Sequence, residues 1–304
     1  MEPIVYIDRA TGKHCVEKVY GARALNLLYG KSFLSKILGA PLIYASCRYP
    51  FFSALYGYLQ KLPGSKKKIQ PFIDFFEIDA SEFLEPVTAF HSFNDFFIRK
   101  LKPAARPIDP RQEIAVIPAD ARYFFHQDIH LSDGFIVKGQ KFDLVTLLGD
   151  QQLAIPYERG AMVMARLCPT DYHRYHFPCD NTPHETRFIN GWLYSVNPIA
   201  LREDIHIFTQ NKRTLCELDS PLFGKVLFME VGATNVGSIH QSYTPNLLAA
   251  KGSEKGFFSF GASFLIILFE PDRIRFDRDL IEATKQGKEI LCKMGESMGS
   301  AVTF

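Results

Sequence analysis

Short apolar segments separated by turn residues make up most of the chain after residue 106. Segments of this length, rich in Val, Ile, Leu and Phe, are typical of β-strands. Helical patterns are sparse in this part; the clearest covers residues 277–287, with Asp277 as a candidate N-cap and Gly287 just past the end. The pattern therefore predicts a β-rich, mostly antiparallel domain over residues 106–304. The candidate strands include IAVIPA, GFIVKG, AMVMARL, TRFINGWLYSV, DIHIFT, RTLCEL, GKVLFMEVGA and FLIILF.

Before residue 106 the apolar positions follow a helical pattern instead. The pieces LNLLYG, FLSKILG and FFSALYGYLQKL are apolar stretches interrupted by lysines, and residues 93–101 place three phenylalanines and a leucine at helical spacing. Three prolines within residues 103–110 end this pattern. We therefore predict an α+β fold, with a helical, basic region over residues 1–105 and the β-rich domain after it.

Charge is distributed unevenly along the 304 residues. The net charge of +2 argues against a protein that coats nucleic acid, and we expect no nucleic-acid partner. Residues 13–68, however, contain ten Lys and Arg against a single acidic residue, Glu17, so this segment carries +9 and the rest of the chain −7. Basic, apolar helices suit an anionic membrane surface. Helices that pack on the protein's own core and expose a basic face explain the same composition.

The cysteines and the first residues of the chain indicate the compartment in which the protein is expected to work. Six cysteines are scattered along the chain without C-x-x-C spacing, which favours a reduced compartment over a disulfide framework. The first residues carry charges and no apolar core of a secretory signal. Because the chain has no uncharged apolar run of about 18 residues, we expect no membrane-spanning helix.

Two histidines and an aspartate are candidates for acid–base chemistry. His173 and His176 lie in CPTDYHRYHFP, and histidine is suited to proton transfer at neutral pH. An H-x-x-H pair can also bind a metal, although the flanking prolines and the lack of a glutamate between the histidines argue against that interpretation. Asp120 follows an apolar strand in VIPADARY, where it can orient an imidazole or cap backbone amides in a turn.

A serine at the start of a buried strand is the candidate nucleophile. Ser263 directly precedes the continuously apolar run Phe264–Phe269, and Gly261 permits a tight bend before it. A hydroxyl in such a turn is well placed for nucleophilic attack. A serine that simply begins a strand is the alternative. The Gly-rich stretch VGATNVGSIH lacks the spacing of a nucleotide-binding loop.

Taken together, these segments resemble the phosphatidylserine decarboxylases, in the family's order and across most of the chain. The segments are SFNDFFIRKLKPAARPID, PAD, VKG, RLCPTDYHRYHFP, NGWLYSVNPIAL, NKR, VGATNVGSI and KGSEKGFFSFGAS. The resemblance implies a proenzyme that cleaves itself before a serine, which becomes a pyruvoyl cofactor. Carried over to this chain, the broken bond is Ala262–Ser263, which gives a β chain of residues 1–262 and an α chain of residues 263–304.

The same resemblance implies roles for the candidate residues. Asp120, His176 and Ser263 match the family's Asp–His–Ser arrangement, in which His176 takes the Ser263 proton and Asp120 orients the imidazole. His173 is assigned to the decarboxylation, and no metal is implied. The implied reaction converts phosphatidylserine to phosphatidylethanolamine and CO2 through a Schiff base to the pyruvoyl group. We expect phosphatidylserine, an anionic membrane surface and a second copy in a homodimer as partners, and a peripheral location on the cytoplasmic side of the cell membrane.

The cleavage point departs from the family's pattern. The family usually has Gly-Ser-Thr where this chain has Ala262, Ser263 and Phe264. Alanine restricts the backbone more than glycine does, and the missing threonine removes a hydroxyl, so we expect slower cleavage. One alternative is a non-processing, membrane-lipid-binding homologue that is inactive because of Ala262 and Phe264. Two others are a metal hydrolase that uses His173 and His176, and a decarboxylase of an unusual lipid such as an archaeal-type phosphoserine lipid.

Overall fold

The computed structural model describes residues 3–19, 50–130, 143–201, 206–233, 239–261 and 263–302. The predicted pieces LNLLYG, FLSKILG and GFIVKG lie outside the described residues, as does Ala262. The remaining predictions can be compared with the structure.

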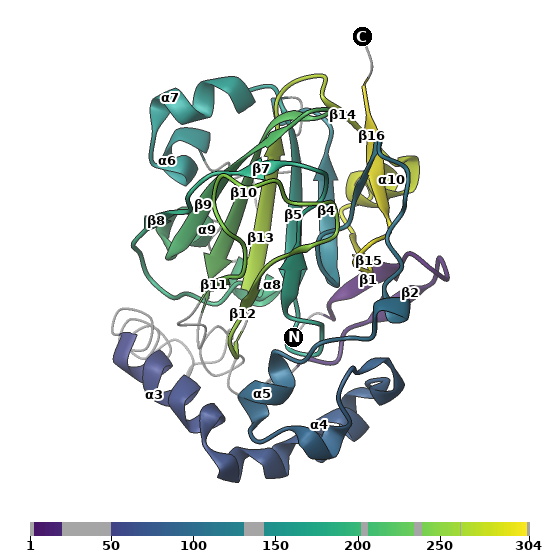
Figure 1. Ribbon diagram of the computed structural model, residues 1–304, viewed down its shortest axis with the longest axis vertical. Helices are drawn as coiled ribbons and strands as arrows, with labels where there is room; N and C mark the ends of the chain where they lie inside the picture. The colour runs from purple at the N-terminus through teal and green to yellow at the C-terminus, as the bar shows by residue number, and fades with distance from the viewer. Residues whose placement is uncertain are drawn as a thin grey trace.

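A long sheet forms the centre of the fold (Figure 1). Its strands run in the order β2-β1-β15-β4-β5-β13-β10-β9-β7, and β8 also pairs with β9. Among these described strands, β1 pairs with β15 in parallel and the other pairs are antiparallel. The predicted α+β class with a mostly antiparallel sheet is therefore confirmed. The bounds are β1 Val5–Asp8, β2 His14–Val16, β4 Ala121–His126, β5 Ala161–Leu167, β7 Thr182–Pro183, β8 Arg187–Ile189, β9 Arg213–Ser220, β10 Gly224–Gly232, β13 Ser263–Phe269 and β15 Glu289–Cys292.

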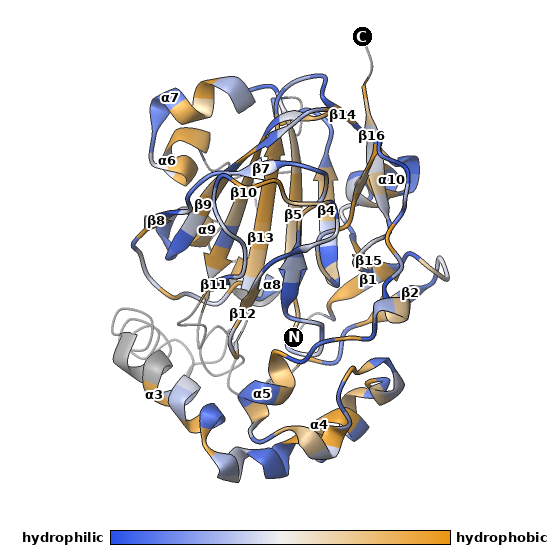
Figure 2. Cartoon of the chain, in the orientation of Figure 1, coloured by the Kyte–Doolittle hydropathy of each residue, from blue (hydrophilic) through white to orange (hydrophobic). Residues whose placement is uncertain are grey.

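The apolar run after Ser263 forms the middle of this sheet. Every residue of β13 is buried, because both faces of the strand are covered. Leu265, Ile267 and Phe269 pack in one core cluster, whereas the alternate residues Phe264, Ile266 and Leu268 pack in another on the opposite face. Figure 2 shows the resulting hydrophobic band along β13 and β10. The predicted buried strand is confirmed.

Two three-stranded sheets complete the β structure. One joins β11 (Ile239–Gln241), β12 (Glu254–Phe258) and β6 (Arg174–His176), and the other joins β14 (Ile274–Phe276), β16 (Ser297–Ala301) and β3 (Ile114–Val116). The first sheet carries His176 on β6, and β12 runs into the turn before Ser263. It therefore brings the histidine motif next to the candidate nucleophile.

Short helices flank the main sheet. They are α6 (Leu144–Leu148), α7 (Gln151–Ala154), α8 (Pro198–Leu201), α9 (Ile207–Gln210) and α10 (Arg278–Lys285). Helix α10 confirms the predicted helix, with Asp277 at the N-cap and Gly287 at φ +68° just past its end. The predicted strand DIHIFT is wrong, because its described part enters helix α9; a short apolar run does not distinguish a strand from a helix.

A helical layer lies below one end of the sheet (Figure 1). It consists of α3 (Pro50–Lys61), α4 (Ile69–Phe76) and α5 (Phe93–Phe97). Its core is a cluster of aromatic and aliphatic side chains, among them Phe72, Phe93 and Phe96. Helix α5 begins at Ser92, whose side chain accepts a hydrogen bond from the Asp95 amide, and it ends sooner than the pattern over residues 93–101 suggests.

The N-terminal residues differ from the expected helical region. β1 and β2 form a strand pair that joins the main sheet through β15, so residues 5–16 belong structurally to the domain expected to start at 106. The pairing is a long-range contact that local periodicity cannot reveal. As for membrane crossing, none of the helices in the described ranges combines the length and the apolar character that a bilayer span requires.

Candidate active site

Ser263 begins β13 and is completely buried. It lies between Gly232 of β10 and Leu167 of β5 in the sheet register. Two residues before it, Gly261 has a φ of +143°, a backbone conformation that favours glycine strongly. The chain therefore bends sharply just before a fixed strand, as the sequence predicted, and the serine hydroxyl is held in the interior.

His173 contacts the Ser263 hydroxyl directly. The His173 Nδ1 atom lies 3.2 Å from Ser263 Oγ, and the Nε2 atom lies 2.8 Å from the carbonyl oxygen of Cys168. A carbonyl oxygen only accepts hydrogen bonds, so Nε2 carries the proton and Nδ1 presents a lone pair to the serine. Burial lowers the pKa of His173 to about 3, which keeps the ring neutral. This arrangement suits His173 to accept the Ser263 proton.

The Cys168 carbonyl that orients His173 belongs to a tightly held turn. The Asp171 amide donates to this carbonyl at 2.9 Å, and the Asp171 carboxylate accepts from the Cys168 amide at 2.7 Å. Arg122 donates to the same carboxylate from β4, while burial raises the pKa of Asp171. Asp171 and Arg122 were not singled out in the sequence, although Asp171 lies only two residues before His173.

The turn is also anchored to the rest of the fold by buried charges. Arg122 is paired with Glu17, which follows β2, and Glu17 in turn binds Arg166 of β5 at 2.7 Å. Glu289 of β15 binds Arg166 as well. These groups compensate one another's charge inside the protein. The N-terminal strand pair thereby contributes to holding the His173 turn.

Asp120 and His176 lie near this centre but have other partners. The Asp120 carboxylate accepts from Arg106 Nη2 at 2.6 Å and from the Met294 amide at 2.9 Å. His176 Nδ1 lies 3.3 Å from the Pro118 carbonyl, and burial lowers the pKa of His176 to about 4. Within the described residues, hydrogen bonds join neither Asp120 to His176 nor His176 to Ser263. The Asp120–His176–Ser263 relay that the resemblance implies stays a prediction, while the observed contact to Ser263 comes from His173.

His173 rather than His176 contacts Ser263 because the two histidines belong to different elements: His176 is the last residue of β6, and His173 precedes the strand. His173 lies in the turn before β6, whereas the His176 backbone amide and ring both face the Pro118 carbonyl. Three residues of separation therefore direct the two rings to different neighbours. Sequence order alone does not decide which ring reaches the serine.

Aromatic rings shield the His173–Ser263 pair from water. Phe97 of α5 stacks on the His173 ring with 3.8 Å between centroids and 24° between planes. Phe260, three residues before Ser263, contacts Phe97 at 4.9 Å and is 3% exposed. The Arg99 guanidinium is the nearby cation, donating to the backbone carbonyls of Thr170 and Asp171. Apolar rings thus cover one side of the His173–Ser263 pair, and Arg99 holds the backbone of the turn beside it.

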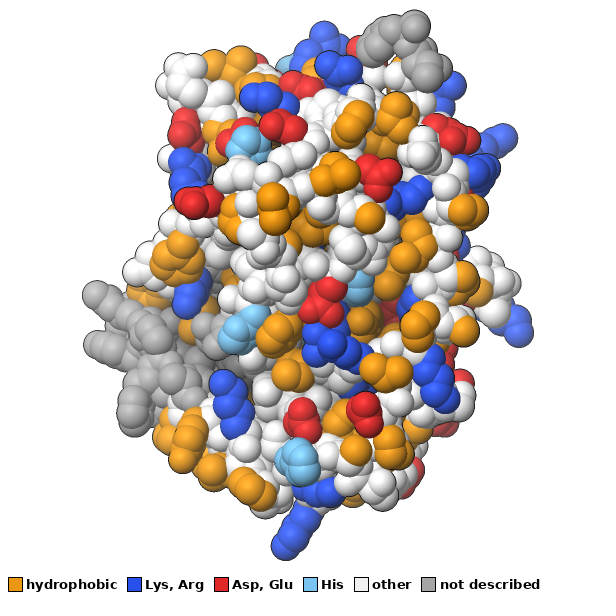
Figure 3. Space-filling model, viewed as in Figure 1, with side chains coloured by type: hydrophobic (Ala, Val, Ile, Leu, Met, Phe, Trp, Pro, Cys, Tyr) orange, Lys and Arg blue, Asp and Glu red, His pale blue; other side chains and the backbone are white. Residues whose placement is uncertain are grey.

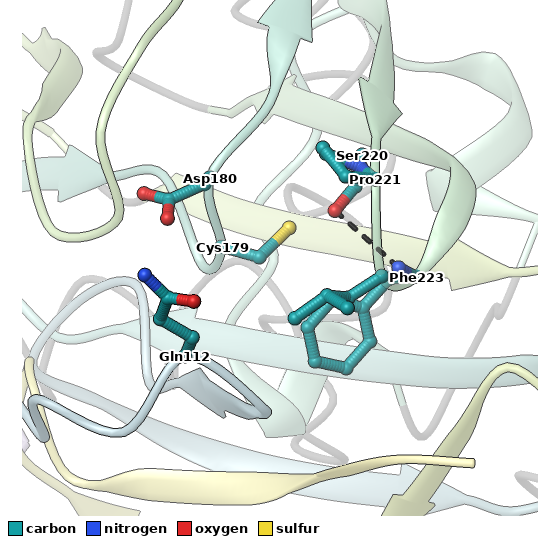
Figure 4. A pocket seen from close by; sticks show the side chains of 7 residues that line it. Gln112, Cys179, Asp180, Ser220, Pro221 and Phe223 are labelled. Carbon is teal, nitrogen blue, oxygen red and sulfur yellow. Dashed lines mark hydrogen bonds between the residues drawn. The ribbon is translucent and has the colours of Figure 1, made fainter. Parts of the chain in front are cut away.

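A separate cavity of about 190 Å³ lies beside the loop that joins β9 to β10 (Figure 4). It contains a cysteine, but burial raises the pKa of the Cys179 thiol to about 12, so the thiol is protonated and unreactive at neutral pH. The lining residues are Gln112, Cys179, Asp180, Ser220, Pro221, Leu222 and Phe223. They include none of the candidate catalytic residues.

Potential metal ligands and cysteines are dispersed in the described parts of the chain. In the described parts of the chain, no group of three or more His, Cys, Asp and Glu side chains is arranged to hold a metal ion. The five cysteines in those parts are free thiols: Cys15, Cys168, Cys179, Cys216 and Cys292.

Comparison with known proteins identifies the family. The phosphatidylserine decarboxylase family model matches residues 93–300, which include the histidine motif and Ser263. The chain is 46% identical over 299 residues to a phosphatidylserine decarboxylase proenzyme of Chlamydia pneumoniae, covering 98% of both chains. It is 45% identical to the proenzymes of Chlamydia muridarum, over 98% of this chain and 97% of the relative, and of Chlamydia caviae, over 99% of both. The chain therefore belongs to the phosphatidylserine decarboxylase family.

Proposed function

We propose that this protein decarboxylates phosphatidylserine with a pyruvoyl group that it makes from Ser263 by cleaving its own Ala262–Ser263 bond. The observation that carries the proposal is the 3.2 Å contact between the buried Ser263 hydroxyl and the unprotonated Nδ1 of His173. The relatives named as proenzymes support the self-processing part.

The first reaction is an acyl shift within the chain. His173 accepts the hydroxyl proton while Ser263 Oγ attacks the carbonyl carbon of Ala262. The peptide C–N bond breaks, the proton passes to the nitrogen of Ser263, and an ester joins the two residues. Loss of the Ser263 α-proton then breaks the Cβ–O bond and releases the Ala262 carboxylate. The dehydroalanine left at position 263 is hydrolysed by water to a pyruvoyl group and ammonia.

The residues around Ser263 fit a pyruvoyl group in the decarboxylation. Such a group supplies a ketone that binds the substrate amine and takes up electrons as CO2 leaves. Phe97 and Phe260 keep the surroundings apolar, and a carboxylate that loses its charge is favoured in a low-dielectric site. Because its Nδ1 faces residue 263, His173 can take up a proton from the substrate ammonium group and pass it to the substrate carbon once CO2 has left. Arg99 is a fixed cation close to this turn.

We also propose that the enzyme works as a peripheral protein on the cytoplasmic surface of the cell membrane. Support comes from the described part of the basic segment, where Leu55, Tyr58 and Leu59 of α3 are 44%, 60% and 46% exposed. Lysines follow at 61 and 66–68. Figure 3 shows hydrophobic side chains on the surface over α3. Exposed apolar groups beside lysines suit an anionic lipid surface.

The test measures cleavage and decarboxylation in the same preparation. Mass spectrometry of the wild-type protein should show two chains with a pyruvoyl N-terminus on residues 263–304, and Ser263→Ala should remain at 34.6 kDa. Vesicles of phosphatidylserine should release CO2 with the wild-type protein only. Ser259→Ala is the matched control, because it removes a nearby hydroxyl that binds His240 rather than His173.

Two results would contradict the proposal. A wild-type chain that stays intact and inactive after long incubation would favour the non-processing, lipid-binding homologue. A Ser263→Ala protein that still cleaves or decarboxylates would exclude Ser263 as the source of the cofactor. Repeating the CO2 assay with archaeal-type phosphoserine lipids distinguishes the remaining substrate alternative.

A further inference from the structure

We infer that Asn94 and Phe260 position the segment before the scissile bond, so that the helical layer of α3, α4 and α5 holds the processing site in its cleavable geometry. The inference rests on the proposed self-cleavage. It assigns Asn94 and Phe260 as positioning residues and α5 as the element through which the layer acts.

Phe260 packs with the helical layer rather than with the β-sheet core. Its side chain is 3% exposed and belongs to the cluster formed by the helices. Its ring centroid lies 5.2 Å from that of Phe93, 4.9 Å from that of Phe97 and 5.8 Å from that of Tyr56. Residues of α3 and α5 thus enclose a side chain that stands three positions before Ser263. The link between the layer and the processing segment is therefore a buried, apolar one.

The backbone of the same residue is held by α5. The Phe260 amide donates to Asn94 Oδ1 at 3.0 Å, and this hydrogen bond is buried. Asn94 is 8% exposed, so the Phe260 amide would have no water to replace this acceptor. The helix is itself fixed at its start, because the Phe93 amide donates to Ser65 Oγ at 2.8 Å. The aromatic cluster thus holds the Phe260 ring in place, and Asn94 holds its backbone amide.

Helix α5 therefore contacts both the segment before the scissile bond and the histidine that faces the nucleophile. Asn94 and Phe97 are three residues apart on α5 and lie on neighbouring positions of its surface. Asn94 binds the segment before the scissile bond, and Phe97 stacks on His173, the ring that faces the nucleophile. Between Phe260 and the fixed strand β13, Gly261 provides the sharp bend at φ +143°. Fixing Phe260 on one side and Ser263 on the other restricts where the intervening carbonyl can lie.

This restriction matters for cleavage more than for decarboxylation. An attack within the chain requires the reacting atoms in near-contact geometry, and a displacement of about 1 Å can cost about 100-fold in rate. After cleavage, Phe260 remains on the β chain and residue 263 starts the α chain. The link from Phe260 through Gly261 to the reacting atom is then cut. We therefore expect the hydrogen bond from the Phe260 amide to Asn94 to govern the processing rate and to leave the turnover of the matured enzyme largely unchanged.

The test compares two kinds of variant. One kind removes a contact of Phe260 with the helical layer, and the other removes a ring elsewhere in the same cluster. Asn94→Leu removes the acceptor, and Phe260→Leu removes the ring that enters the layer. Phe90→Leu is the matched control, because Phe90 is buried in this cluster and packs edge-to-face against Phe83 and Phe96. The full-length chains are synthesised in a cell-free system, and the intact fraction is followed with time. The kcat on phosphatidylserine vesicles is expressed per matured α chain.

We expect Asn94→Leu and Phe260→Leu to slow cleavage by about 10- to 100-fold. For Asn94→Leu, whose side chain binds the Phe260 amide and has no contact with His173 or Ser263 in the described part of the chain, kcat per matured chain should stay within about twofold of wild type. Phe90→Leu should cleave at the wild-type rate, even if its melting temperature falls as far as that of Phe260→Leu. Wild-type cleavage rates in both Asn94→Leu and Phe260→Leu would overturn the inference. Equal slowing in Phe90→Leu, or a fall in kcat per matured chain of Asn94→Leu that parallels its slower cleavage, would overturn it as well. These outcomes leave the proposed function intact, because that proposal fails on other results: a wild-type chain that does not process itself, or a Ser263→Ala chain that still cleaves or decarboxylates.

Discussion

Replacing His173 by glutamine is the most direct test of the observed site geometry. Glutamine is close to histidine in size and can still donate to the Cys168 carbonyl, but its amide cannot take a proton from Ser263. His173 is completely buried against Phe97, so the substitution removes the base without opening the site to solvent. His176→Gln is the matched comparison, because its ring lies next to the Pro118 carbonyl instead.

The expected loss follows from the role of a general base. Such a group contributes about 10²- to 10⁴-fold, which corresponds to about 3 to 5 kcal/mol in the barrier. We therefore expect His173→Gln to cleave at least 100-fold more slowly than wild type. His176→Gln should retain most of the wild-type rate. Cell-free synthesis followed by quenching and mass spectrometry gives first-order rate constants for all three chains.

The pH dependence of the wild-type chain supplies an independent check. A base must be neutral to act, and burial lowers the pKa of His173 to about 3, below the usual value of 6.5. The cleavage rate should consequently show no loss from His173 protonation as the pH falls from about 8 to about 5. The reasoning is refuted if His173→Gln cleaves normally while His176→Gln stays intact, since that would establish the Asp120–His176–Ser263 relay that the family resemblance implies.

Three further changes probe the surroundings of the site. Gly261→Ala should slow cleavage at least tenfold in the same assay, because φ +143° costs alanine about 1 to 3 kcal/mol, and an unchanged rate would contradict the strained bend. Lys255→Met should lower the free energy of unfolding by about 3 to 5 kcal/mol, measured in urea in a Ser263→Ala background, since it leaves Glu230 buried at 0% exposure without its 2.6 Å partner. Adding Glu230→Leu should restore most of that loss, and a double variant as unstable as the single one would refute the pairing argument. Finally, the depressed pKa values of His173 and His176 contribute stability that is complete above about pH 6.5 and is lost as the pH falls toward about 4, so the urea midpoint of the same background should drop over that range and stay level above it.

Local sequence patterns correctly predicted the buried strand β13 and the helix α10. The apolar run after Ser263 specified a strand covered on both faces, and the alternating packing of Leu265 and Ile266 into two clusters shows why every position is apolar. Asp277 and Gly287 bound α10 at the positions that the local pattern predicts, although the Asp277 carboxylate binds Arg9 and caps no helix amide. The strand prediction for DIHIFT is wrong, because the four residues of helix α9 are too few to establish a helical period.

The candidate residues could be found from the sequence because they lie in short segments, and these same segments carry the resemblance to the family. By itself the sequence thus determined the fold class and the family, and it singled out His173 and Ser263, which the structure brings into contact. Only the tertiary structure decided which histidine reaches Ser263, because His173 and Ser263 are 90 positions apart and meet through pairing of β6, β12 and β13 with their neighbours. It also brings Glu17 to Arg122 and Asn94 to the Phe260 amide. Such contacts arise from packing between distant segments, and local hydrophobic periodicity carries no information about them.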